Sequence, residues 1–538
     1  MMSDESSPSV VAHSTTTRPV TTKTPASLSP GPIQPKQDST LTSPVIAKSE
    51  TVHAKSSLPG GVAGSVAEST ASVQNRPPVA RRSGSTDKGT KVHGSFDVMG
   101  GIAEYCGALT LSAQARDCVH VEATPRQDER IAISVAPHAS SFDVAIRHAN
   151  NGHHADSNPA ESEVAGDWPL SIFYGTGDGQ FNTSETVIGY GRSVGSDAAG
   201  LSLAVLRMML AAGVVPHFGG GLSIRIESKL LGDRTRQAAS LASCVFRAVL
   251  NAFHVECAVS NAASILHDSL EAFGGIPCGL ATVASPMVDK PGHLSPICCR
   301  PMEVGEFVAL PSGVTVMGVD SGIVYPNAMK KYLHARTTSK MGAAIIARLI
   351  NGANAGQDEW HGYLARISVA EYVERFRDLL PTKIKGKQFL ERFGPLPDPT
   401  AVIDANDTYK IRSRTEHHIY ENERVCHFVE RLSRANRTGD DNAIIEAGEL
   451  MYASHWSYGQ RCGLGSRETD TLVNLIRKCT TDAGVFGARV SGAGAGGTVV
   501  VLMRDSDETR AAVINAVKQY EQETGLKTAL QPAACLPS

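Results

Sequence analysis

The sequence lacks three features that would place it at once in a common class of protein. No apolar run reaches the roughly 18 residues that span a bilayer, and the first residues contain no apolar signal core. No block of basic residues occurs, and the net charge is −3. These absences argue against a membrane protein and against a nucleic-acid-binding protein, and they favour a cytoplasmic location.

The eleven cysteines lack the arrangement of a metal site or of a disulfide framework. None stands in a C-x-x-C pair, and only Cys298 and Cys299 are adjacent. Zinc sites and disulfide-rich domains both need closely spaced pairs, so neither is indicated. We therefore expect reduced, mostly buried thiols and no bound metal from the cysteines.

Residues 1–90 are poor in large apolar side chains and rich in serine, threonine and proline. Such a segment cannot bury enough apolar surface to offset the entropy lost on ordering. The composition predicts a disordered segment, which could serve as the binding element for a protein partner. Two domains are expected to follow, at residues 91–325 and 326–538.

Beyond residue 90 the composition becomes globular, with strands and helices mixed throughout. Short apolar strands are expected at residues 117–123, 130–136 and 222–228, and helices dominate from residue 344 onward. The helical pattern is clearest at residues 235–253, where one face carries Ala238, Leu241, Val245, Val249 and Phe253. We predict an α+β fold. Further helices are expected at residues 343–350, 371–380, 425–436, 444–456 and 469–479.

The stretch RVSGAGAGGTVVVLM, residues 489–503, contains a glycine-rich loop. Gly492, Gly494 and Gly497 fit the pattern G-x-G-x-x-G, but residues 488–490 and 498–503 read as strands, so the loop joins two strands. Such a loop can hold an anion through a nest of backbone N–H groups. It can also be a hairpin in a crowded place where only glycine fits. The sequence leaves both interpretations open.

Three further stretches precede this loop in a definite order. They read GSFDVMGGIAEYCGALTL at residues 94–111, SKLLGDRTRQAASLASCV at 228–245 and IPCGLATVASPMVDKPGHLSPICCRP at 276–301. Their order and spacing over residues 92–505 resemble the GHMP sugar kinases, most closely L-arabinokinase and more distantly galactokinase. The resemblance implies a two-domain fold with a central cleft. It also implies phosphorylation of a sugar at its anomeric hydroxyl, with ATP and Mg²⁺ as cofactors.

The sugar-facing motif is preserved in this sequence. The run D-V-M-G-G-I-A-D-Y of the family differs only at Glu104, so Asp97, Glu104 and Tyr105 are the expected sugar-binding residues. Tyr332 stands where galactokinases place a sugar-contacting tyrosine, although a buried structural role is equally open. The family's third glycine motif is also preserved, and the resemblance places it beside the nucleotide. Its residues here are Gly492, Gly494, Gly496 and Gly497.

The phosphate-transfer motifs are altered. The family's clamp G-L-S-S-S-A stands at a helix start and here has lost its middle glycine and its serines. Ser95 replaces an arginine near the transferred phosphate, and Thr282 replaces the aspartate that contacts the attacking hydroxyl. Asp289 would need a rearranged loop to substitute for that aspartate. The candidate residues of the altered clamp are Gly232, Arg234, Thr235, Arg236 and Gln237.

Three functions remain open from the sequence. The leading hypothesis is a pseudokinase that binds a sugar or a nucleotide, because three catalytic elements are altered together. The second is an active kinase for L-arabinose or galactose with a rewired site, and the third is a scaffolding protein. The two arginines of the altered clamp could bind an anion by charge, or could be a solvated helix start.

Overall fold

The computed structural model of the chain describes residues 89–136, 163–175, 180–215, 218, 220–232, 234–274, 276, 278–323, 327–351, 360, 362–398, 400–492, 494 and 497–534. They lie within one compact unit, Ser83–Ser538. The predicted N-terminal segment lies outside the described residues up to residue 88, and the first strand already begins at Thr90. The mixed α+β class is confirmed, and the predicted domain boundary at residue 325 stays a prediction.

The larger sheet contains eight strands of the described chain, and the glycine loop does not belong to it. Its order is β4-β3-β5-β2-β6-β7, with β1 also on β2 and β8 also on β6. Strands β3 and β5 are parallel, and the other pairs are antiparallel. The bounds are β1 Thr90–Met99, β2 Leu109–Pro125, β3 Arg130–Val135, β4 Val164–Pro169, β5 Gly221–Ser228, β6 His293–Cys299, β7 Met302–Val304 and β8 Val308–Ala309.

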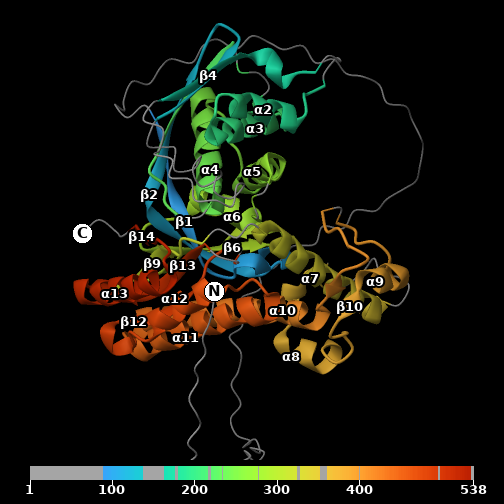
Figure 1. Cartoon of the computed structure of the whole chain (residues 1–538), viewed down its shortest axis with the longest axis vertical. Coiled ribbons are helices and arrows are strands. Elements are labelled where there is room, and N and C mark those ends of the chain that lie inside the picture. Colours follow the sequence, from blue (N-terminus) through green and yellow to red (C-terminus); the bar gives the residue numbers. More distant parts are fainter. Residues whose placement is uncertain are drawn as a thin grey trace, which may run out of the picture. The chain divides into compact units, whose positions relative to one another are not determined.

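Helices cover one face of the larger sheet (Figure 1). The longest of them, α4, packs on β1 and β2 through the apolar face that the sequence predicts. Of that face, Ala238, Leu241, Val245 and Val249 are buried, and Phe253 packs against the same core. These helices are α2 Ser184–Ser193, α3 Asp197–Ala211, α4 Arg234–Phe253, α5 Val259–Phe273 and α6 Leu280–Val288.

A second, antiparallel sheet has the order β12-β13-β9-β14. Strands β12 and β13 flank the glycine loop, as the sequence predicts. Nearly all residues of these two strands are buried. Helices α11 and α12 cover β12, and β13 is paired on its other edge with β9. The bounds are β9 Val314–Asp320, β12 Val485–Val490, β13 Thr498–Arg504 and β14 Ala529–Pro532. A separate ribbon pairs β10 Ile384–Lys385 with β11 Thr408–Tyr409.

Helices dominate the described chain from residue 344 to residue 477, as predicted, and α7 already begins at Ala328. The prediction of a helix over residues 371–380 is confirmed in part: α8 ends at Glu371, a π-helical turn, η5 Tyr372–Phe376, continues it, and residues 377–380 are not helical. Pro381 disfavours helical geometry at Leu380, the last residue of the predicted helix. The helices are α7 Ala328–Asn351, α8 Val369–Glu371, α9 Gly386–Phe393, α10 Ile411–Thr438, α11 Asp441–Ser457, α12 Arg467–Arg477 and α13 Asp507–Thr524.

Five short helical turns complete the described fold. Of these, η1 follows β1 directly and η6 continues α11. The turns are η1 Gly101–Cys106, η3 Leu170–Phe173, η4 Leu364–Arg366, η6 Tyr458–Cys462 and η7 Thr481–Ala483.

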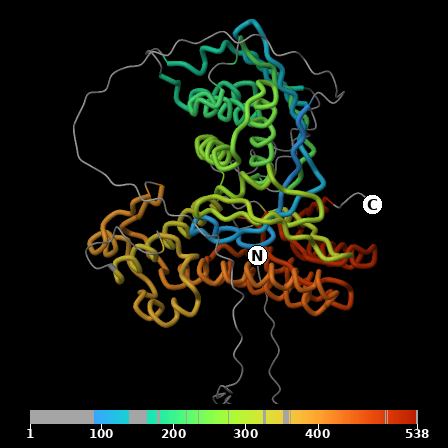
Figure 2. The backbone as a smooth tube through the Cα atoms, turned by 180° about the vertical axis from the view of Figure 1, so that it is seen from behind, coloured from blue at the N-terminus to red at the C-terminus, as the bar shows by residue number. Residues whose placement is uncertain are grey.

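The C-terminal segment of the described chain returns to the larger sheet. Figure 2 shows the blue tube that starts at β1 passing beside the red C-terminal segment, and Ala115 of β2 forms a β-bridge with Ala533. Helix α10 also contacts β2 of the larger sheet and α11 beside the smaller one, so the two sheets share packing partners. None of the described helices combines the length and the apolar character needed to cross a bilayer.

Candidate functional site

Asp97, near the end of β1, ties the sugar-facing motif to the glycine loop. Its Oδ1 accepts a hydrogen bond from the N–H of Gly101 at 3.0 Å. Its Oδ2 accepts from the N–H of Gly492 at 2.9 Å and from Nη1 of Arg489 at 2.9 Å. Arg489 is fully buried, so the ion pair supplies the counter-charge that a buried guanidinium needs. Two motifs that are about 395 residues apart in the chain thus meet at one carboxylate.

The turn after Asp97 needs glycine because another side chain approaches it closely. Gly101 has φ +47°, and a Cβ there would lie 1.7 Å from the hydroxyl oxygen of Tyr458. That hydroxyl accepts from the N–H of Ile102 at 2.6 Å and donates to the carbonyl of Gly492 at 3.0 Å. Tyr458 therefore joins the sugar-facing motif to the glycine loop a second time.

Glu104 faces the start of α6, where Thr282 stands. Its Oε2 accepts from the N–H of Ala281 at 2.7 Å, and its Oε1 accepts from the Thr282 hydroxyl at 3.2 Å. The residue is 4% exposed, and burial raises the pKa of its carboxyl to about 7, with the nearby charge of Asp97 adding to the rise. The side chain therefore caps α6 from another element.

Ser95 donates to a carboxylate rather than facing open solvent. Its hydroxyl lies 2.5 Å from Oδ2 of Asp289, and the hydroxyl of Ser112 lies 2.6 Å from Oδ1. Burial raises the pKa of the Asp289 carboxyl to about 6, while the two hydroxyl groups lower it. Asp289 follows α6 and reaches Ser95, not Thr282, so it does not replace the missing aspartate in this arrangement.

Arg236, in the first turn of α4, is bound by groups of the chain itself. Nη2 and Nη1 lie 2.6 and 3.0 Å from the two carboxylate oxygens of Asp117. Nε donates to the carbonyl of Ser95 at 3.1 Å, and Nη1 also donates to the carbonyl of Leu231. A Cβ on Gly94 would lie 2.2 Å from Nη2, so only glycine leaves room for this guanidinium. Arg236 is thus buried and paired, so it is not a solvated helix start, and its predicted role in anion binding stays a prediction.

The remaining residues of the altered clamp lie around the same helix start. Arg234 begins α4 and its guanidinium carbon is 6.0 Å from the ring centre of Phe273. Burial lowers the pKa of Arg234, and the charge of Asp197 opposes that change. Gln237 donates from Nε2 to the carbonyl of Gly232 at 2.7 Å. Thr235 lies in the first turn of α4, and no acidic residue stands in that turn.

The two candidate tyrosines pack against each other. Their ring centres are 6.2 Å apart in an edge-to-face arrangement. The hydroxyl of Tyr332 donates to the carbonyl of Cys278 at 3.3 Å, and the hydroxyl of Tyr105 lies 3.1 Å from Nε2 of His418. Tyr332 is buried, as the structural alternative requires, and it borders the loop that precedes Thr282.

The glycine loop adopts the backbone geometry that favours glycine. Gly492, Gly494 and Gly497 have φ values of +63°, +70° and +78°. The carbonyl of Gly497 accepts from both the N–H and the hydroxyl of Ser321. Gly496 lies outside the described residues. Of the two open interpretations, the crowded turn is directly visible at Gly494, where a Cβ would lie 2.9 Å from Leu464.

Comparisons with known proteins identify the relationship. Residues 437–522 match the family described as GHMP kinases C terminal. The chain is 26% identical to L-arabinokinase of Arabidopsis thaliana over 475 residues, which is 80% of this chain and 44% of that protein. It is 29% identical to a galactokinase of Chloroflexus aurantiacus over 263 residues, or 49% of this chain and 55% of that protein.

The chain is a homologue of the GHMP sugar kinases. It spans about half the length of the curated relatives it matches. The crystal structure of Lactococcus lactis galactokinase complexed with galactose superposes with a TM-score of 0.58 and 16% identity, over 84% of this chain and 94% of that one. The predicted GHMP-kinase-like fold is therefore confirmed, and the central cleft stays a prediction.

In this GHMP homologue the predicted site residues form three sets of contacts. Asp97 is joined to the glycine loop, and Glu104 is joined to Thr282. Ser95 is joined through its carbonyl to Arg236 and through its hydroxyl to Asp289. Each set contains a residue of β1 or of the turn that follows it, so one sequence motif contributes to the whole region. Their roles in binding and in catalysis stay predictions.

Sequence reasoning did not single out several residues that hold this region together. They are Asp117, Tyr458 and Arg489, together with the full role of Asp289. Arg489 carried a usable signal, because it is a charged residue in the otherwise apolar strand β12. The ion pair between Asp117 and Arg236 could not be predicted in this way, because the two residues are 119 positions apart and no local sequence pattern links them.

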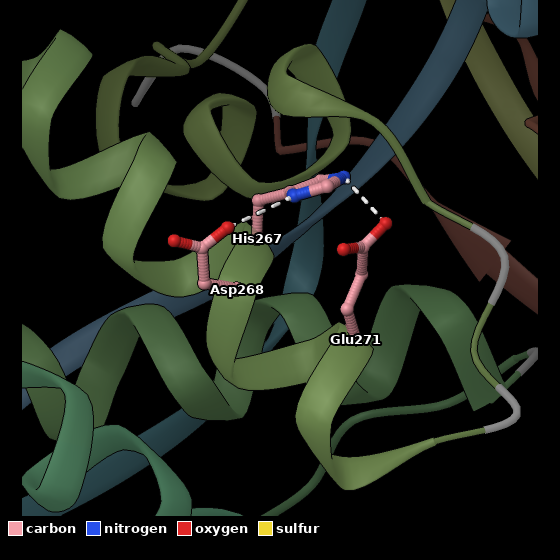
Figure 3. A group of neighbouring side chains, drawn as sticks. All are labelled: His267, Asp268 and Glu271. Carbon is pink, nitrogen blue, oxygen red and sulfur yellow. Dashed lines mark ion pairs between the residues drawn. The ribbon is translucent and has the colours of Figure 1, made fainter. Parts of the chain in front are cut away.

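One group of potential metal ligands lies on α5. Figure 3 shows His267 between Asp268 and Glu271, with each ring nitrogen facing a different carboxylate. Each nitrogen lies 3.6 Å from its carboxylate oxygen, and Glu271 also lies 3.8 Å from Nη1 of Arg336. Because the two nitrogens of one ring point in opposite directions, one ion cannot use both. The group offers no argument for Mg²⁺, which prefers oxygen ligands in octahedral geometry.

Proposed function

We propose that this GHMP homologue is a cytoplasmic pseudokinase that binds a monosaccharide of the galactose or L-arabinose type and transfers phosphate to it very poorly. The proposal rests on the charge at Ser95. The resemblance implies an arginine there, near the transferred phosphate, and phosphoryl transfer depends on positive charge at that place. This chain instead places the Asp289 carboxylate 2.5 Å from the Ser95 hydroxyl. A carboxylate at this position repels a triphosphate instead of stabilising it.

The residues at the start of α4 fit a triphosphate poorly. A helix N-terminus favours anions through its free N–H groups and its dipole, and that general advantage remains. The hydroxyl groups of the family clamp are gone, however, and Arg236 is neutralised by Asp117 at 2.6 Å. The helix start therefore fits ATP and Mg²⁺, the cofactors that the resemblance implies, less well than the family clamp does.

The sugar-facing side supports binding of a ligand. Asp97 keeps some exposure, 18% of its side chain, and a carboxylate can accept hydrogen bonds from sugar hydroxyl groups. L. lactis galactokinase, which shares the fold, is described in complex with galactose. We propose a small sugar as the main partner and no nucleic acid. A protein partner for residues 1–90 would give the scaffolding alternative.

A second function, an active kinase with a rewired site, is favoured by one observation. Glu104 carries a carboxyl whose burial raises its pKa to about 7, and it lies 3.2 Å from the hydroxyl of Thr282. A general base works best when its pKa is near the working pH. In this alternative Glu104 would take the proton that the family's aspartate would otherwise accept, acting directly on the sugar hydroxyl.

Binding and transfer are separated by one set of experiments. Melting temperatures measured with galactose, L-arabinose and Mg²⁺-ATP report binding, while sugar phosphate formed over the same panel reports transfer. We expect a sugar-dependent shift that weakens in Asp97→Asn, and transfer that is undetectable. Thr282→Asp alone should not restore transfer, and we expect recovery only when Ser95→Arg and a G-L-S-S-S-A loop are added. Transfer by the wild-type chain that disappears in Glu104→Gln would instead establish the rewired kinase.

A further inference from the structure

Three arginines in the described part of the chain are less than a tenth exposed: Arg236, Arg414 and Arg489. Two of them have a carboxylate partner, Asp117 at 2.6 Å and Asp97 at 2.9 Å. Arg414, in the first turn of α10, is 8% exposed. Its Nε is buried without a partner, and no residue in the described ranges accepts a hydrogen bond from its guanidinium or forms an ion pair with it. Arg414 is therefore the exception that needs an explanation.

The guanidinium lies among groups that cannot neutralise it. Nη2 is close to Gly463 at the end of η6, where a Cβ would be only 2.6 Å away. Burial lowers the pKa of Arg414. The neighbouring groups that oppose this change are Cys462 and Tyr105, and neither of them is a carboxylate. From α7, His334 faces the same charge, and after burial that charge is the next cause lowering the pKa of His334. An unpaired buried charge of this kind is costly, and such charges in proteins are normally paired.

A second orphan polar group lies one helical turn further along α10. His418 is fully buried, and burial lowers the pKa of its ring to about 3, so the ring is neutral. Its Nε2 lies 3.1 Å from the hydroxyl of Tyr105, while its Nδ1 is buried without a partner. When Tyr105 donates to Nε2, the ring proton is on Nδ1, which is then a free donor. Residues four apart lie on one helix face, so Arg414 and His418 are neighbours.

We propose that Arg414 and His418 form a receptor for one small oxyanion, of the phosphate or carboxylate class, between α7, α10 and η6. A planar guanidinium fork matches two oxygens of such an ion, and a histidine N–H supplies a further donor. The ion would neutralise the buried charge and satisfy the two orphan donors together. This site does not involve Ser95, α4 or the glycine loop, so it does not depend on the proposed function. Its contact with Tyr105 links it to the sugar-facing motif.

Calorimetric titration of the full chain with sodium phosphate, and separately with sodium acetate, tests this site at constant ionic strength. Arg414→Met removes the charge, Arg414→Lys keeps the charge without the fork, and Arg437→Met is the control at an exposed position of the same helix. We expect one equivalent of oxyanion to bind to the wild type and to the control. Arg414→Lys should bind at least about 10-fold more weakly, and Arg414→Met should not bind at this site. The acetate and phosphate titrations distinguish the two classes.

Melting temperatures give an independent readout. Saturating oxyanion should raise the melting temperature of the wild type by about 2 °C or more beyond the rise seen in Arg414→Met. The difference between variants matters because phosphate strengthens folding of any protein by exclusion from its surface. Equal shifts in all four proteins, with Arg414→Met more stable than wild type in oxyanion-free buffer, would show an unpaired arginine hydrated only by buried water. Should Arg414→Met fail to fold, Arg414→Lys decides: unweakened binding overturns the proposal.

Discussion

The two sides of the candidate site differ in how far their residues preserve the family's motifs. On the sugar-facing side, Asp97 and Glu104 preserve the family's acidic pattern, and each also holds the fold together, through Arg489 and through α6. On the phosphate side, Ser95 and Arg236 depart from the family and are bound by Asp289 and Asp117. A preserved motif can therefore reflect architecture as much as binding. An altered motif says more about lost function when its substituted residues form hydrogen bonds or ion pairs within the chain.

The largest expected effect comes from the sugar-facing side. Asp97→Ala removes the partner of the fully buried Arg489 and the acceptor of two backbone N–H groups. Leaving a buried charge unpaired costs about 3–5 kcal/mol. Chemical denaturation should report a loss of that size, whereas the control Asp378→Ala, at a side chain 73% exposed, should change stability by less than about 0.5 kcal/mol. A loss below about 1 kcal/mol would mean that Arg489 has another source of compensation.

A comparable but smaller loss is expected on the phosphate side. Asp117→Ala should cost about 3 kcal/mol, the low end of the range for a broken buried pair, because the carbonyls of Leu231 and Ser95 still accept from Arg236. Replacing both partners, as in Asp117→Leu with Arg236→Met, should recover most of that stability. If Arg236 instead binds a nucleotide, the double variant would lose a nucleotide-dependent rise in melting temperature that the wild type shows.

The pH dependence of stability sharpens the comparison further. A carboxyl whose pKa is higher in the folded state contributes stability that is present below its unfolded pKa and is lost as the pH rises through its folded pKa. For Glu104 the window runs from 4.5 to about 7. Each pKa unit corresponds to about 1.4 kcal/mol, so the upper bound is on the order of 3 kcal/mol. Glu104→Gln should flatten the fall in stability between pH 5 and 8. An unchanged slope would mean that Glu104 does not titrate in this window.

The smallest expected effect is at Thr282. Thr282→Val removes one hydrogen bond of 3.2 Å to Glu104 and leaves that carboxylate its bond from Ala281. The net loss should be about 1 kcal/mol, measured by denaturation at pH 7. A loss of several kcal/mol would give Thr282 a larger structural role than its contacts indicate.

The sequence predicted those features that depend on local pattern. The apolar face of α4 and the strands on both sides of the glycine loop follow from periodicity, and both are confirmed. The π-helical turn at Tyr372–Phe376 was missed because a segment of five residues is too short for its period to show in the apolar pattern.

The environment of the site could not be read from the sequence in the same way. A motif names Glu104 and Thr282 separately, but only the fold brings α6 to η1 and joins them. Likewise, Asp289 lies in the stretch at residues 276–301, yet its contact with Ser95 spans 194 residues. Burial then sets the pKa of Asp289 and Glu104, and burial is a property of the packed chain.

The central claim is that this homologue keeps a sugar-facing side and has lost efficient phosphate transfer. The most direct test is ³¹P NMR of the wild-type chain with Mg²⁺-ATP and galactose or L-arabinose, followed over hours at pH 7.5. We predict no sugar phosphate above the uncatalysed background, or a rate at least about three decades below the 1–100 s⁻¹ typical of kinases. Accumulation of a sugar phosphate at a rate within that typical range would contradict the account.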